Sequence, residues 1–201
     1  MPQLNTLHFP GLDSQLQASA ELQAMALDGE VYPLADGYAM VDAPLTPQLK
    51  ARAVCLDFCD RLVPAGLSAL WVWGLVFEPR THTVALRTKM RANHATLDRR
   101  RVRELEFDAQ SLQQAGELMI CSPTRAVADL LRDPQHYSSD VRSEISTLLC
   151  RYPELITSVR EYLLQQSRIP YTQDGLRELA LAHSIHVVDG IDTANRVENT
   201  L

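Results

Sequence analysis

The chain has 201 residues, of which 46% are hydrophobic and 22% charged. These proportions are ordinary for a soluble globular protein and exclude an intrinsically disordered chain. The longest uncharged stretch, between Arg61 and Glu78, is shorter than the roughly 20 apolar residues of a membrane-spanning helix. No lysine or arginine precedes Lys50, so the basic region of a signal peptide is absent, and we expect a cytoplasmic protein without membrane association.

The net charge of −6 is distributed unevenly along the chain. Residues 1–60 carry two basic and eight acidic side chains, and residues 104–201 carry eight basic and fifteen acidic ones. Residues 61–103 carry nine basic side chains and two acidic ones. The positive charge is therefore concentrated in the middle of the sequence.

The N-terminal part is expected to form a helix followed by a β-hairpin. Residues 14–27 are rich in helix formers, and Ser14 is a suitable N-cap. Residues 31–41 alternate apolar and small side chains around Asp36-Gly37, a pair favoured in two-residue hairpin turns. A winged-helix plan also has this order, but a DNA-reading helix needs cations for the phosphates, and residues 14–43 carry none. The residues therefore favour a structural or protein-contact role here over DNA reading.

Two further helices are expected before the basic region. Thr46-Pro47 is a cap followed by a proline and predicts a helix to about Asp60. A shorter helix follows within residues 67–75, where Gly74 is a stop signal. Trp71 and Trp73 are two residues apart and cannot share one helical face, so one belongs to the core and the other to a boundary or a partner contact.

The central cations lie on or between two predicted strands, 82–89 and 100–107, which alternate in character. With residues 118–121 they predict one sheet of at least three strands. We call the following set the basic cluster: Arg87, Lys89, Arg91, Arg99, Arg100, Arg101 and Arg103. Such a cluster can neutralise nucleic-acid phosphates. The alternative is a solvated strand face whose charges pair with Glu104, Glu106 and Asp108.

A strand-to-helix junction follows at residues 118–132. Residues 118–121 are a short apolar run typical of a buried strand, Ser122 is a suitable N-cap and Pro123 fits the first helical position. The apolar stripe of the helix excludes Arg125, Asp129 and Arg132, and Arg125 and Asp129 are spaced to pair along it for a few tenths of a kcal/mol.

The remainder, residues 134–201, is expected to be mainly helical. The predicted helices run from Ser138 or Ser139 to Cys150, from Tyr152-Pro153 to Gln166, and from Thr172 to about His183, followed by a short strand at 186–191. His183 and His186 lack a third ligand in sequence reach, so we expect no metal site.

No motif points to catalysis or to a cofactor. Neither a P-loop nor a G-x-G-x-x-G turn is present, and Gly66-Leu67-Ser68-Ala69-Leu70 lacks the second glycine of a nucleophile elbow. The Glu-x-Lys element of restriction-type nucleases is also missing. The cysteines, Cys55, Cys59, Cys121 and Cys150, form no C-x-x-C pair and are expected to be reduced core thiols.

Three landmarks of the sequence carry a resemblance: GEVYPLADGY from Gly29, AGLSALWVWGL from Ala65, and CSPTRAVADLL from Cys121. In this order and spacing the chain resembles the AbiEi-like antitoxins of type IV toxin-antitoxin systems. The resemblance implies an α+β fold with a reduced winged-helix-like region (1–45), an α/β antitoxin-like core (46–133) and a helical C-terminal region (134–201).

The resemblance also implies a non-enzymatic transcriptional regulator that binds DNA and opposes a nucleotidyltransferase-like toxin. If DNA is bound, we expect the basic cluster to contact its phosphates. The alternative hypothesis is a protein-interaction or dimerisation module, possible as a homodimer, that keeps the scaffold without DNA binding. The acidic ends of the chain and its cation-free N-terminal helix favour that alternative.

Overall fold

The structure, a computed structural model, describes residues 6–7, 12–55, 61–86, 100–108, 110–166 and 169–182; for residues 6–7, 12–19 and Arg100 it describes the backbone alone. Backbone contacts divide the chain into two units, Met1–Cys121 (unit 1) and Ser122–Leu201 (unit 2). Helices and small sheets both occur, which confirms the predicted α+β class. The segment boundaries expected at residues 45 and 133 stay predictions.

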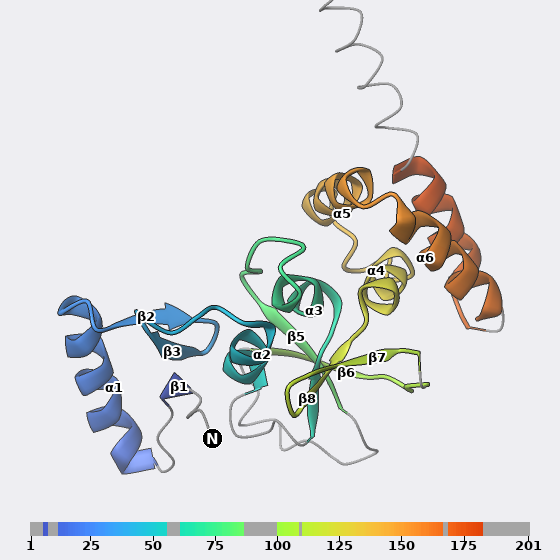
Figure 1. Cartoon of the computed structure of the whole chain (residues 1–201). Coiled ribbons are helices and arrows are strands. Elements are labelled where there is room, and N and C mark those ends of the chain that lie inside the picture. Colours follow the sequence, from blue (N-terminus) through green and yellow to red (C-terminus); the bar gives the residue numbers. More distant parts are fainter. Residues whose placement is uncertain are drawn as a thin grey trace, which may run out of the picture. The chain divides into compact units, whose positions relative to one another are not determined.

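Unit 1 begins with a small antiparallel sheet and a helix, coloured blue in Figure 1. Its elements are β1 (Thr6–Leu7), α1 (Leu12–Leu27), β2 (Val31–Leu34) and β3 (Gly37–Met40), with the strands in the order β1-β3-β2. Helix α1 contacts β2, while the following helix contacts β1 and β3. The expected helix and hairpin are thus present, and their kinship with a winged helix stays a prediction.

The hairpin turns one residue earlier than its sequence suggests. Leu34 pairs with Gly37, so the two turn residues are Ala35 and Asp36. Ala35 has a φ of 51°, in the region that normally favours glycine. Its N–H donates to the Glu78 carboxylate over 2.9 Å, a contact from 43 residues away that no local turn pattern contains.

The rest of unit 1 has two helices and a mixed sheet. The elements are α2 (Pro47–Cys55), β4 (Leu62–Pro64), α3 (Gly66–Val72), β5 (His82–Leu86) and β6 (Arg100–Glu104). As predicted, Thr46 caps α2, accepting from the Leu49 N–H over 3.2 Å, and Gly74, with a φ of 75°, follows the end of α3. Strand β4 pairs antiparallel with β5, and β6 pairs parallel with it.

The prediction that residues 118–121 join the strands of the basic region in one sheet is wrong. Strand β8 (Leu118–Cys121) pairs in the described structure with β7 (Leu112–Ala115), which the sequence did not reveal. Ala115 pairs with Leu118, so the turn is Gly116-Glu117, and Gly116 has a φ of 62°. A two-residue turn gives β8 a partner with little loss of chain entropy, which favours this hairpin over a distant pairing.

The core of unit 1 lies between α2, α3 and the strands. Its fully buried side chains include Val54, Val63, Leu70, Val72, Val84 and Ile120. Trp71 is buried in this core, whereas Trp73 is half-buried and donates from Nε1 to the Cys121 carbonyl over 2.9 Å. The two tryptophans therefore take the different environments that their spacing predicted.

Unit 2 is helical wherever the structure describes regular elements in it. It contains α4 (Pro123–Leu131), α5 (Ser139–Arg151), α6 (Glu154–Gln165) and a helical stretch over residues 172–182. Helices α4 and α5 both contact α6, around a core that includes Val127, Ile145, Leu149, Val159 and Leu163. Ser122 and Ser138 cap α4 and α5, as predicted.

Several expectations in unit 2 are corrected or lie beyond the described part. Thr172 is the first residue of its helical stretch instead of the cap before it, and its hydroxyl donates to the carbonyls of Gln166 and Ile169. Cys150 is exposed on α5, unlike the buried Cys55 and Cys121, because it falls opposite the apolar stripe of that helix. Cys59, His183, His186 and the strand expected at 186–191 lie outside the described residues.

Candidate functional site

The basic cluster is described in part. Arg100, Arg101 and Arg103 lie on β6, while Arg87, Lys89, Arg91 and Arg99 fall outside the described residues. Along the strand, Arg101 and Arg103 share one face. Arg101 is exposed, and Arg103 is half-buried and makes a further polar contact. The strand thus presents at least one cation to solvent.

Strand β6 is at one edge of its sheet in the described structure, since the strand order is β4-β5-β6. Edge strands leave backbone groups and side chains open to partners. Two acidic side chains, Glu104 and Glu106, follow the arginines and are also exposed. Glu106 makes a polar contact of its own. Strand β6 and the residues that follow it therefore carry charges of both signs, with the arginines before the carboxylates along the chain.

Strands β5 and β6 pair in parallel. His82 pairs with Arg100, and Leu86 pairs with Glu104. The chain therefore leaves β5 and enters β6 at opposite ends of the strand pair, about 13 Å apart for four residues of strand. On β6, the described members of the basic cluster lie between Arg100 and Arg103, at the edge of the sheet in the described structure.

A second group of polar side chains reaches from the interior of unit 1 to its surface. Ser68 of α3 has no exposed surface, and its Oγ lies 3.1 Å from Nδ1 of His82. The same Oγ accepts a hydrogen bond of 2.8 Å from the Thr83 N–H. On the other side of the ring, Nε2 of His82 lies 3.6 Å from Oε1 of Glu78. We call Ser68, His82 and Glu78 the interior relay.

The composition of the interior relay resembles that of a hydrolase triad, but its geometry does not suit nucleophilic catalysis. A nucleophilic serine must reach a substrate carbonyl. Ser68 is 0% exposed, and both its neighbours, Thr83 and His82, already engage its oxygen. The relay therefore joins α3, β5 and the hairpin tip as a structural network.

Lys50 is the buried cation of unit 1, and it is 9% exposed. Its Nζ donates to the Trp71 carbonyl over 3.0 Å and lies 5.1 Å from the centre of the same indole ring. Burial lowers the pKa of Lys50, and the negative charge of Glu78 opposes this effect. The signal in the sequence was a lysine inside the apolar stretch 49–55, but the contact with Trp71 is non-local.

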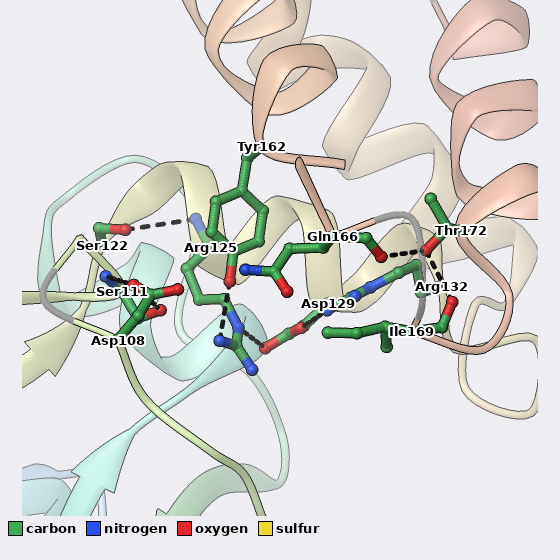
Figure 2. Close-up of polar contacts among 10 residues, drawn as sticks. All are labelled: Asp108, Ser111, Ser122, Arg125, Asp129, Arg132, Tyr162, Gln166, Ile169 and Thr172. Carbon is green, nitrogen blue, oxygen red and sulfur yellow. Dashed lines mark hydrogen bonds and ion pairs between the residues drawn. The ribbon is translucent and has the colours of Figure 1, made fainter. Parts of the chain in front are cut away.

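Unit 2 contains a buried ionic network on α4. Asp129 lies between two guanidinium groups: Arg125 donates from Nε to Oδ2 over 2.6 Å, and Arg132 donates from Nη2 to Oδ1. Figure 2 shows this carboxylate between the two arginines. Arg125 also donates from Nη1 to the Tyr162 hydroxyl over 2.8 Å. The network thereby ties α4 to α6.

The positions of these charged residues correct the sequence-based expectation. Arg125, Asp129 and Arg132 lie off the apolar stripe, as predicted, yet their exposed fractions are only 5%, 4% and 8%. The apolar stripe identifies one buried face of α4, but the polar face of this helix is buried as well. Gly175 makes room for Arg132, since an added Cβ would come within 2.9 Å of its Cγ.

The described residues contain no group of three histidine, cysteine, aspartate or glutamate side chains that could hold a metal ion. Their helices also include none with the length and apolar character needed to cross a membrane.

No protein-family model matches the chain, and no curated protein matches it.

Proposed function

We propose that this chain is a non-enzymatic regulator, similar to the AbiEi-like antitoxins, that binds nucleic acid through the basic cluster. The observation that carries the proposal is the exposed Arg101 on the edge strand β6, next in sequence to Arg100 and close to Arg103. An edge strand with a row of arginines can lie along a phosphate backbone. Such contacts neutralise phosphates and carry no base information by themselves.

The acidic flanks of the chain affect how strongly it is expected to bind nucleic acid. Because residues 1–60 and 104–201 are both net acidic, they repel a polyanion, and the affinity rests on the few cations of the basic cluster. We expect weak binding without sequence preference that depends steeply on salt. The N-terminal helix and hairpin carry no cation before Lys50 and are not expected to contact phosphates.

Fluorescence anisotropy with a labelled duplex of unrelated sequence tests the proposal. At about 50 mM salt we expect a saturable rise in anisotropy, and at about 200 mM a large loss of affinity. A second duplex of different sequence should bind equally well. Flat titrations at the lower salt concentration contradict the proposal, whereas strong discrimination between the duplexes contradicts the phosphate-only mode.

A second candidate is a module for protein interaction or self-association in the N-terminal part. Leu27, at the end of α1, is 89% exposed, and Val41, after β3, is 58% exposed. The two flank Glu30, whose carbonyl accepts from the Val41 N–H over 3.1 Å. Exposed apolar side chains near one junction favour a protein contact over a solvated surface.

Sedimentation velocity over a range of concentrations tests this candidate. We expect self-association in the wild type and its loss in Leu27→Ser with Val41→Ser. A strict monomer at every concentration contradicts the dimer form of the candidate.

The first proposal also includes a nucleotidyltransferase-like toxin that the regulator opposes. Co-expression of this chain with such a toxin, encoded by a neighbouring gene, tests that part of the proposal through rescue of growth.

A further inference from the structure

One carboxylate oxygen joins the hairpin tip to the interior relay of unit 1. Oε1 of Glu78 accepts the Ala35 N–H over 2.9 Å and lies 3.6 Å from Nε2 of His82. Ala35 is the turn residue with a φ of 51°, so this hydrogen bond supports a backbone conformation that alanine does not favour. The side chain of Glu78 is 43% exposed, whereas that of His82 is 6% exposed.

The hydrogen bonds of Ser68 are compatible with one neutral tautomer of His82. Ser68 accepts from the Thr83 N–H, so its hydroxyl hydrogen can donate to Nδ1 of His82. The ring proton then resides on Nε2 and faces Glu78. When the ring is protonated, Nδ1 donates as well, and the Ser68 hydroxyl hydrogen must turn away so that its oxygen accepts this bond.

We propose that Glu78 and His82 form a proton-sensitive tether for the tip of the β2–β3 hairpin. Protonation of His82 turns its 3.6 Å contact with Glu78, which is too long for a hydrogen bond, into an ion pair. Opposite charges at this distance attract each other, and the attraction is stronger where burial reduces screening by water. The carboxylate is then held more firmly in the position where it accepts from Ala35, and the hairpin tip opens less often.

The charged groups around His82 work in opposite directions. Glu78 favours the protonated ring, whereas Lys50 of α2, on the Trp71 ring that lies 5.3 Å from His82, disfavours it. Arg80 lies two residues before His82, and Arg100 is its backbone partner on β6. Asp36 adds a carboxylate beside Ala35. Strand β4 and helix α3 contribute no ionisable side chain. The ring therefore has charged groups of both signs in its surroundings.

Amide hydrogen exchange at Ala35, followed by NMR between about pH 5.5 and 7.5, tests the tether. After division by the intrinsic exchange rate, the opening constant of the wild type should rise with pH by about fivefold, the factor that corresponds to 1 kcal/mol. Glu78→Gln keeps an acceptor for Ala35 but has no charge, so its corrected opening constant should not change with pH. His136→Asn, a histidine change in unit 2, should behave as the wild type.

The outcomes separate cleanly. A wild-type opening constant that does not vary with pH overturns the proposal, as does a Glu78→Gln variant that keeps the wild-type variation. His82→Asn should also abolish the variation. If that buried variant does not fold, Glu78→Gln decides alone, because its side chain is 43% exposed and the change is nearly isosteric.

Discussion

The guanidinium of Arg125 donates to the hydroxyl of Tyr162 over 2.8 Å, joining α4 to α6 across 37 residues of sequence. The same guanidinium lies 5.8 Å from the centre of the tyrosine ring and binds Asp129 through Nε. One tyrosine therefore offers both its hydroxyl and its ring to a buried cation. This contact gives unit 2 a polar fastening beside its apolar core.

Asp129→Asn should lower the free energy of unfolding of unit 2 by about 3–5 kcal/mol. The change is nearly isosteric, but it removes the negative charge between Arg125 and Arg132 while both stay buried. Urea denaturation followed by far-UV circular dichroism measures the loss.

Arg142→Gln is the matched control for that experiment. Arg142 pairs with Glu178, but the two side chains are 44% and 21% exposed. Exposed ion pairs contribute about 0–1 kcal/mol, so this variant should stay close to the wild type. Equal losses in the two variants contradict the buried network described for α4.

Tyr162→Phe isolates one hydrogen bond of the network. It keeps the ring beside Arg125 but removes the acceptor for Nη1, and we expect a loss of about 1–3 kcal/mol. The same denaturation experiment measures it. A variant as stable as the wild type would show that another group takes over the role of the hydroxyl.

The pH dependence of stability, compared between the wild type and Lys50→Met, tests the buried cation Lys50 of unit 1. Because burial lowers the pKa of Lys50, the folded protein loses this proton before the unfolded chain does at about 10.5. The unfolded state therefore binds more protons in that interval, and stability of the wild type should rise relative to Lys50→Met as the pH approaches 10.5. Urea denaturation by tryptophan fluorescence reports on unit 1, which contains Trp71 and Trp73. A constant difference between the two proteins contradicts the lowered pKa.

The variants Gly116→Ala and Gly29→Ala compare two glycines that have a positive φ. At Gly116 an added Cβ would overlap the side-chain amide of Gln48, whereas at Gly29, with a φ of 77°, nothing lies within 4 Å. Both variants should lose about 1 kcal/mol of stability because alanine does not favour a backbone conformation with positive φ. Gly116→Ala should lose more, because Gln48 must move. A greater loss in Gly29→Ala, by the same fluorescence measurement, contradicts this account of the β7–β8 turn.

The junction from β8 into α4 could be predicted because its signals are all local. Ser122 accepts from the Arg125 N–H over 3.3 Å, and Pro123 takes the first turn, as the order of residues indicated. Capping at Thr46 and at Ser138 was readable for the same reason.

Features that depend on distant contacts could not be read from the sequence. The positive φ of Ala35 depends on Glu78, and the burial of Arg125 and Asp129 depends on α6, which supplies Tyr162. The apolar stripe of a helix reveals only its apolar face. From the sequence alone, polar side chains off that stripe are therefore expected at the surface, even where they contact another helix. Likewise, strand β8 pairs with β7, whose residues Leu112–Ala115 show too little alternation to mark a strand.

The salt dependence of DNA binding, compared between the wild type, Arg101→Ala and Arg80→Ala, tests the proposed function most directly. Arg101 and Arg80 are both exposed cations of unit 1, and only Arg101 belongs to the basic cluster. If Arg101 contacts a phosphate, its removal should reduce the slope of the logarithm of the binding constant against the logarithm of salt concentration by about 0.9, whereas Arg80→Ala should leave the slope unchanged. Absence of binding at low salt, or equal effects of the two substitutions, would contradict the account.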